Sequence, residues 1–505
     1  MSKPDPKSTA GRSYSQIACV GTGLSAIALG ATLKRWYSLD DIRFFDRDSD
    51  CGGTWHANTY PGCACDIPSA LYSFSFHLNP KWTMSMPSYK EVKAYLDEVV
   101  DTYGLRAKMT FSTEVRECVW RDDVHRWRLT LVDLVTGEIS SHECQILFAA
   151  SGALVKPRPC DIPGAEAFRG DIFHSARWRH DVSLEGKKVV VFGNGCTAAQ
   201  IIPAIYIPLA MKLHRLQIFL VAEAELRLFP MTKTAARHRE RRKQEAEKYM
   251  RETAPEKYHD ILIPDFDVGC KRRVFDSGYL RSLHSDKLVL TDTKITEIVP
   301  DGLKTAEGGF IPADVIVLAT GFQTNQFTTY MAVHGKTKET LEEHWRRHDG
   351  PGAYNCSVVK DFPNFFLLLG PNSATGHTSA LIAAENSVNY ALRILKPVLR
   401  GEATSVEIKQ EAEDRYIGDV QRALRQTVWN AGCASWYLNS KRWNAMAYPW
   451  SQAHYWYRSL FPVWSDWNIK VLLLVAVNAA VVYSGSPSFW PWAMASVKKI
   501  VLGCQ

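Results

Sequence analysis

The sequence contains no Cys-x-x-Cys pair, although it has 12 cysteines among its 505 residues. The two most closely spaced, Cys63 and Cys65, have one residue between them, a spacing that fits neither a redox dithiol nor a zinc knuckle. The scattered cysteines are therefore expected to be reduced thiols of an intracellular protein. This pattern argues against a disulfide reductase, and no metal site is predicted.

The chain also lacks a strong net charge. A formal charge of +7 is mild for this length, so no nucleic-acid partner is expected. The most basic stretch, residues 236–243, is interleaved with glutamates and predicts a solvated helix face. The N-terminus is polar and has no apolar core of a signal peptide. We expect an intracellular protein, either cytoplasmic or membrane-associated through its C-terminal tail.

That tail has no charged residue between Val471 and Val497. A run of this length can cross a hydrocarbon layer as a transmembrane helix, with two tryptophans and a tyrosine available for the interface. Residues 484–488 are rich in Ser, Gly and Pro and interrupt the run, which favours a packed or interfacial helix. Membrane contact through residues 471–497 and a packed helix are both open interpretations.

What the chain does contain is two glycine-rich fingerprints, Gly21-Thr22-Gly23-Leu24-Ser25-Ala26 and Gly193-Asn194-Gly195-Cys196-Thr197-Ala198. Each follows an apolar, strand-like run and opens a helix-like one. The glycines permit a tight turn and a close approach to a pyrophosphate, which the helix N-terminus then faces. Two such motifs predict two nucleotides, most simply FAD and a nicotinamide. Asp46 ends the next strand-like run after the first motif and is predicted to bind the ribose of FAD.

The predicted fold class is α/β, with two Rossmann-like dinucleotide-binding domains and a helical C-terminal region. A strand running into small residues occurs at 146–152 and again at 315–321, and the second is expected to return the chain to the first domain. We expect a disordered leader at 1–14, the FAD-binding domain at 15–155 and 301–400, an inserted NADP-binding domain at 156–300, a helical Trp-rich region at 401–465 and a hydrophobic tail at 466–505.

Residues 168–178 have the pattern Phe-x-Gly-x-x-x-His-x-x-x-Trp just ahead of the second fingerprint. This signature resembles that of the Baeyer–Villiger and flavin-containing monooxygenases, the class B flavoprotein monooxygenases. The resemblance covers about residues 15–460 and is closest to fungal members of secondary metabolism. Trp178 favours the Baeyer–Villiger branch, whereas Arg179 departs from the Pro or Asp of its pattern. His174 is expected to pack between domains, with a direct proton role as the alternative.

The resemblance also extends to the loop Gly52–Gly62, which matches the flavin-contacting loop of the family, and to Gly370-Pro371-Asn372 with Gly376-His377, which resembles a loop that reaches the flavin ring. Motif and resemblance together assign to FAD the residues Gly21, Gly23, Ala26, Asp46, Gly53, Thr54, Trp55, His56, Ala57, Asp66, Ile67, Tyr72, Val115 and Asn372. They assign to NADP the residues Ala64, Cys65, Gly193, Asn194, Gly195, Cys196, Thr197 and Ala198.

The resemblance implies an FAD-dependent, NADPH-using monooxygenase that inserts one oxygen atom of O2 into a ketone through a flavin C4a-peroxide. A guanidinium suits the peroxide anion because it stays charged. By the register of Lys271-Arg272-Arg273 with the family, this residue is Arg272, with Arg273 as the alternative, and Asp66 orients it. The implied substrate is a polyketide or terpenoid ketone of a fungal pathway. Oxygenation of nitrogen or sulfur, or hydroxylation, is the alternative chemistry.

The sequence departs from the family after Ala204, where a strand and an arginine for the 2′-phosphate of NADPH are expected. One interpretation makes residues 216–221 that strand, with Glu223 near the ribose, which favours NADH. The other is an NADP-binding domain truncated after residue 204, and a flavin-binding protein whose reduction by NADPH is impaired. The helical spacing of Leu213, Leu216 and Leu220 favours the second.

Overall fold

The fold is built on a mixed sheet whose parallel centre carries the first fingerprint. The computed structural model describes residues 12–204, 215–432 and 435–472. Within these ranges the sheet has the order β13-β4-β5-β6-β1-β2-β3, and β14 also pairs with β6. Its strands are β1 (Arg12–Val20), β2 (Ile42–Phe45), β3 (Met109–Thr110), β4 (Thr113–Arg121), β5 (Arg126–Asp133), β6 (Ile139–Ala149), β13 (Ala332–His334) and β14 (Phe365–Leu367).

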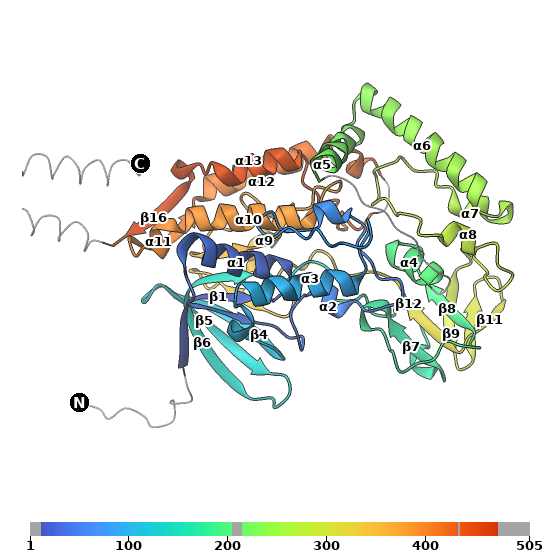
Figure 1. The fold of residues 1–505 in the computed structure, drawn as a ribbon, viewed down its shortest axis with the longest axis horizontal. Helices are drawn as coiled ribbons and strands as arrows, with labels where there is room; N and C mark the ends of the chain where they lie inside the picture. The colour runs from blue at the N-terminus through green and yellow to red at the C-terminus, as the bar shows by residue number, and fades with distance from the viewer. Residues whose placement is uncertain (1–11, 205–214, 433–434, 473–505) are drawn as a thin grey trace, which may run out of the picture.

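Helices α1 (Leu24–Tyr37), α3 (Tyr89–Thr102) and α10 (Ala380–Ile394) cover this sheet. α1 packs against both α3 and α10, and α10 packs against α13 (Gln452–Leu460). Figure 1 shows these helices running side by side along the sheet. The helix predicted after the first fingerprint is thereby confirmed as α1.

A second, smaller unit holds the other fingerprint. β7 (Asp171–His174), β12 (Val315–Leu318) and β8 (Val189–Phe192) form a parallel sheet in that order. β9 (Ile295–Val299), β10 (Gly302–Thr305) and β11 (Phe310–Pro312) form an antiparallel sheet beside it. α4 (Cys196–Ala204) follows β8, and in Figure 1 the whole unit lies at one end of the molecule.

The predicted end of the inserted domain, residue 300, is wrong. β12 pairs with β7 and β8 and therefore belongs to the inserted domain, not to the first one. The two crossing segments pair with each other: Arg158 donates its N–H to the carbonyl of Gly321 (3.0 Å), and Gln323 donates to Lys156 (3.0 Å). The insertion therefore begins at about residue 156 and ends near residue 321.

Three other expectations need correction. Residues 12–14, assigned to a disordered leader, start β1, where Arg12 pairs with Ser141 of β6. The region 401–465 is not wholly helical, because β15 (Ala403–Ile408) pairs with β16 (Trp467–Val471). Cys270 is disulfide-bonded, so not every cysteine is a free thiol.

The remaining helices build the surface of the inserted domain and the C-terminal region. The charged helix predicted around residues 236–243 is confirmed as α6, which Thr232 caps by accepting from the N–H of Ala235. These helices are α2 (Thr54–Ala57), α5 (Arg215–Ala224), α6 (Lys233–Thr253), α7 (His259–Leu262), α8 (Tyr279–Ser282), α9 (Leu341–Arg346), α11 (Lys396–Leu399) and α12 (Gln410–Arg425).

Most of the hydrophobic tail predicted at 466–505 lies outside the described residues. Only Asp466, β16 and Leu472 belong to the described part, and Leu472 donates its N–H to the carbonyl of Glu402 (3.0 Å). Among the helices of the described ranges, none has the length and apolar character needed to span a membrane. Membrane contact through the tail stays a prediction.

Candidate active site

The first fingerprint forms a tight turn between β1 and α1. Gly21 has φ +106°, and a Cβ there would lie 2.5 Å from the carbonyl oxygen of Ala150. Gly23 caps α1 without a side-chain hydrogen bond from the described residues, so the first N–H groups of the helix are open to a ligand. Ala26 is fully buried, which lets α1 lie close on the sheet. This turn has the shape that a pyrophosphate requires.

Asp46 lies beside this turn, directly after β2. Its carboxylate accepts hydrogen bonds from the N–H and the hydroxyl of Thr22, both at 2.7 Å, and from the N–H of Asp48 at 3.0 Å. Burial raises the pKa of Asp46. Val115 is buried on β4, two residues after Thr113, whose N–H donates to the carbonyl of Asp46 (2.8 Å). Asp46 therefore lies beside the first fingerprint, and Val115 lies on the strand that Thr113 ties to Asp46.

The predicted flavin loop packs directly on the fingerprint. A Cβ on Gly53 would lie 2.9 Å from the Cα of Gly23, so the two backbones touch. α2 follows and carries Thr54, Trp55, His56 and Ala57. The Trp55 indole donates to the hydroxyl of Tyr72 (3.0 Å), and both rings are buried. The loop thus presents backbone and flat apolar rings next to the first nucleotide site.

The predicted catalytic pair is assembled by the fold. Arg272 donates from Nε to Oδ2 of Asp66 at 3.0 Å, and one terminal nitrogen donates to the same oxygen at 2.5 Å. Burial lowers the pKa of Arg272, but the charge and hydrogen bonds of Asp66 raise it by more, so the guanidinium stays charged. The two side chains keep 33% and 27% of their surface, so a small molecule can reach the pair. Arg273, the alternative, instead pairs with Glu225 at 3.5 Å.

Groups from both domains surround this pair. Burial raises the pKa of the buried Tyr437, and Arg272 opposes the shift by its charge and a hydrogen bond. Burial also raises the pKa of the Cys196 thiol, which Asp66 raises further and Arg272 lowers. Cys196 is the first residue of α4, so the second fingerprint reaches the guanidinium. Cys65 is buried one residue before Asp66, and Ile67 donates its N–H to the Cys65 sulfur (3.4 Å).

The second fingerprint repeats the geometry of the first. Gly193 has φ +113°, and a Cβ there would lie 2.4 Å from the carbonyl oxygen of Ala319, at the end of β12. A Cβ on Gly195 would meet no described atom within 4 Å. Asn194 is exposed, Thr197 half-buried and Ala198 buried. The N-terminus of α4 therefore has open space in front of it, as a bound dinucleotide requires.

Two orphaned hydroxyls mark the two nucleotide sites. The Ser151 Oγ and the Thr320 Oγ1 are buried and have no hydrogen-bond partner among the described residues. Each follows the strand that neighbours a fingerprint, namely β6 and β12. Buried hydroxyls normally have a partner, so each is available to hydrogen-bond a ligand. Together with the two turns, these hydroxyls fit one dinucleotide in each domain.

Segment 216–221 is not a strand, so the interpretation that places Glu223 at a ribose is wrong. These residues lie in α5, and Glu223 instead accepts from His377 Nε2 (2.8 Å) and from the N–H of Gln452 at the start of α13 (3.1 Å). The helical spacing of the leucines predicted this helix. Within the described ranges β8 pairs with β12 alone, so its other edge is open.

The loop predicted to reach the flavin ring is held by hydrogen bonds to a later segment of the chain. Asn372, with φ +60°, donates from Nδ2 to the carbonyls of Asn444 (2.7 Å) and Ala447 (3.0 Å). His174 also has both ring nitrogens engaged, with the carbonyl of Gly321 (3.1 Å) and the N–H of Ala176 (3.1 Å). His174 therefore joins β7 to the interdomain linker, which supports its structural role.

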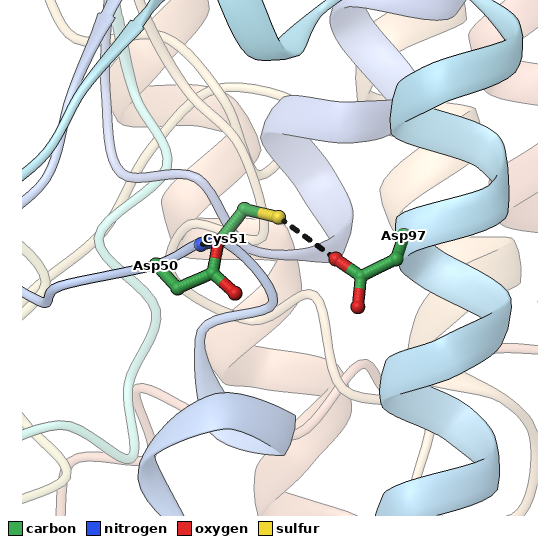
Figure 2. A group of neighbouring side chains, drawn as sticks. All are labelled: Asp50, Cys51 and Asp97. Carbon is green, nitrogen blue, oxygen red and sulfur yellow. Dashed lines mark hydrogen bonds between the residues drawn. The ribbon is translucent and has the colours of Figure 1, made fainter.

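Asp50, Cys51 and Asp97 form the group shown in Figure 2, in which the Cys51 sulfur points at Asp97. Lys93 binds both carboxylates, at 2.8 and 2.7 Å, and Arg106 binds both at 2.9 Å. These two cations balance the two acids, so we assign an ion-pair network rather than a metal site. Burial raises the pKa of Asp50, but Lys93 and Arg106 lower it to about 2. The network ties the start of the flavin loop to α3.

Known proteins are similar to this chain in sequence and in fold. The flavin-binding monooxygenase-like family model matches residues 15–209. A Baeyer–Villiger monooxygenase of Streptomyces coelicolor is 31% identical over 478 residues, which cover 87% of this chain and 90% of the relative. A second, from Pseudomonas aeruginosa, is 30% identical and covers 84% of this chain and 86% of the relative. The chain belongs to the Baeyer–Villiger monooxygenase family.

One fungal relative and one solved structure are also similar to this Baeyer–Villiger monooxygenase family member. The FAD-binding monooxygenase tazF of Aspergillus terreus is 29% identical and covers 84% of this chain and 82% of the relative. Among solved structures, an oxidized steroid monooxygenase bound to NADP is 25% identical, with a TM-score of 0.78, and covers 91% of this chain and 100% of that chain. The predicted family, fold class and enzyme type are thereby confirmed.

Sequence reasoning missed residues that complete the site. They are Tyr437 and Gln200 of α4, and neither belongs to a motif described above. Gln200 bonds to Tyr60 of the flavin loop and to Ala64, two residues after the end of this loop. The sequence could have indicated Gln200 by its position four residues after Cys196, which places both residues on the same face of one helix.

Proposed function

We propose that this protein is an FAD-dependent, NADPH-using Baeyer–Villiger monooxygenase that inserts one oxygen atom of O2 into a ketone. The observation that carries the proposal is the Asp66–Arg272 ion pair, which joins the two domains and lies beside Cys196 of the second dinucleotide-type turn. FAD would occupy the turn at Gly21, and NADPH the turn at Gly193. Solved relatives with the same fold are described as bound to NADP, and one as a complex with FAD and NADP.

The chain contributes charge, orientation and shielding to this reaction. Reduced FAD, when bound, supplies the electrons that activate O2. Arg272 provides a fixed positive charge for the anionic oxygen species, and its charge does not depend on pH in the working range. Asp66 holds the guanidinium in one orientation through two hydrogen bonds. The buried rings of Tyr72 and Tyr437 lie beside the pair and shield part of it from water.

The intermediate and the substrate are also part of what we propose for this protein. Transfer through a flavin C4a-peroxide is the step that the family resemblance implies. A polyketide or terpenoid ketone of a fungal pathway is the proposed substrate class, supported by similarity to FAD-binding monooxygenases of Aspergillus terreus and Aspergillus niger. A panel of cyclic, aryl and terpenoid ketones tests this class, with thioethers and amines included to detect oxygenation at sulfur or nitrogen.

One observation favours a second candidate function. β8 is half-exposed along its length and has one partner strand within the described ranges, as expected for a nicotinamide domain that lacks a strand. In that case the protein binds FAD but is reduced slowly. Anaerobic mixing of the purified flavoprotein with NADPH separates the two. Rapid bleaching of the flavin band supports the monooxygenase, and an unchanged band supports the flavin-binding protein.

A further inference from the structure

We infer that Gln200 is a positioning residue that joins α4 of the inserted domain to the loop carrying Asp66. This inference rests on the proposed function, because the contacts of Gln200 affect the reaction by fixing the position of the Asp66–Arg272 pair. Gln200 Nε2 donates to the carbonyl of Ala64 (3.0 Å), and Gln200 Oε1 accepts from the hydroxyl of Tyr60 (2.9 Å). A single side chain thus makes two bonds across the domain boundary.

The two partners fix the orientation of the Gln200 amide. The Ala64 carbonyl only accepts, so the NH2 end must face it and the oxygen must face Tyr60. Tyr60 is 7% exposed, and burial raises the pKa of its phenol, so the hydroxyl stays protonated and donates. Thr197, three residues earlier on α4, also reaches this hydroxyl. Glutamate cannot donate to Ala64, and alanine makes neither bond.

The loop between Tyr60 and Asp66 is held from the opposite side by the start of α3. Cys65 donates its N–H to Pro87 (2.8 Å), and Tyr89 donates to Cys63 (2.9 Å). Ala64 therefore lies between the α3 segment and Gln200, with Asp66 two residues further along. Loss of the Gln200 contact leaves the loop bound on one side, and the Asp66 carboxylate gains freedom to move.

Movement of Asp66 matters because it orients the guanidinium of Arg272. Displacing a catalytic group by about 1 Å can cost on the order of 100-fold in rate. Gln200 lies one turn after Cys196 on the helix whose N-terminus forms the second nucleotide site. The junction therefore links the placement of the nicotinamide-binding helix to the placement of the catalytic charge.

The test uses the FAD-loaded full chain and four variants: Gln200→Ala, Gln200→Glu, Tyr60→Phe and the control Gln244→Ala. Gln244 is an exposed α6 residue that bonds to Glu240 of its own helix. Two quantities are measured per bound flavin: the anaerobic rate of flavin reduction by NADPH, and the ratio of oxygenated product to hydrogen peroxide with the best ketone of the panel. Thermal melting records folding.

We expect Gln200→Ala to lower the product-to-peroxide ratio about tenfold, because a displaced guanidinium stabilises the activated oxygen less well and more of it is lost as hydrogen peroxide. The rate of flavin reduction should change by no more than about twofold. Gln200→Glu and Tyr60→Phe each keep one bond and should give intermediate ratios, while Gln244→Ala matches the wild type. A wild-type ratio in all three site variants overturns the inference. If Gln200→Ala fails to fold, wild-type ratios in the other two overturn it. Failure of the wild type itself to oxygenate any ketone would instead refute the proposed function.

Discussion

Arg272 and Asp66 are 206 positions apart in the sequence, and their side chains are joined by a hydrogen bond of 3.0 Å. Asp66 lies in the first domain, and Arg272 lies in the inserted one. The pair therefore exists only when the two domains are docked. Its charge and position make it the centre of the proposed chemistry.

Replacement of Arg272 by Ala should separate reduction from oxygenation. The reductant site uses the second fingerprint, so NADPH should still bleach the flavin. Loss of the fixed charge should lower ketone oxygenation by about 10²–10³-fold, the usual effect of removing one electrostatic stabiliser. Stopped-flow reduction and product analysis measure the two steps. Equal loss of both would show that Arg272 acts in nucleotide binding instead.

Gly21→Ala should abolish FAD binding. The new Cβ would lie 2.5 Å from the Ala150 carbonyl oxygen, at a backbone φ of +106° that side chains rarely adopt. The purified variant should lack the flavin absorption band. Gly418→Ala is the control, because a Cβ at this position of α12 meets nothing within 4 Å. This control should retain flavin and gain up to about 1 kcal/mol of stability. Normal flavin content in Gly21→Ala would contradict the assignment of the site.

Glu223→Gln should lower stability without changing the preference for NADPH over NADH. Glu223 joins α5 to His377 and to the first turn of α13, so its loss should cost about 1–2 kcal/mol in the free energy of unfolding. Denaturant unfolding and the KM values for both nucleotides give the comparison. A changed nucleotide preference would restore the interpretation of Glu223 as a ribose ligand.

Stability should fall as the pH drops from about 6.5 to 4, partly through His142. Its ring bonds to Ser13 and Ser15 of β1 (2.7 and 2.8 Å), and burial lowers its pKa to about 4. The unfolded chain then binds a proton that the folded chain does not. The free energy of unfolding is therefore unaffected by this group above the unfolded pKa of about 6.5. It falls by up to about 3 kcal/mol as the pH drops to the folded pKa of about 4.

His142→Gln removes this titration while keeping a polar partner for the serines. The wild type should lose more stability than His142→Gln between pH 7 and acid pH, whereas His238→Gln on α6 should follow the wild type. Parallel curves for wild type and His142→Gln would mean that the folded chain protonates this ring as readily as the unfolded chain does, and the assignment would be wrong.

The parts of the fold that the sequence predicted well are local. Each fingerprint lies between an apolar strand and a helix of small residues, so Gly21 and Gly193 were placed by short-range constraints. The end of the inserted domain was misplaced because residues 146–152 and 315–321 have the same pattern. Both are buried parallel strands that run into a small-residue turn, and only pairing with β7 and β8 distinguishes the second.

The family resemblance predicts the catalytic pair, whereas the spacing of residues does not, because no sequence period connects Asp66 to Arg272. Tyr437 and Gln200 were missed for the same reason. Each contacts the site across a domain boundary, and such contacts depend on docking. α5 was foreseen because the leucine spacing at 213, 216 and 220 is a property of one helix.

The central claim is that the Asp66–Arg272 pair directs activated oxygen into a ketone. The most direct measurement supplies ¹⁸O2 and NADPH to the wild type and to Arg272→Ala, with the same ketone panel, and determines labelled ester and hydrogen peroxide per NADPH consumed. The account predicts one ¹⁸O atom in the ester from the wild type, and peroxide with almost no ester from the variant. Equal yields of labelled ester from both proteins would contradict it.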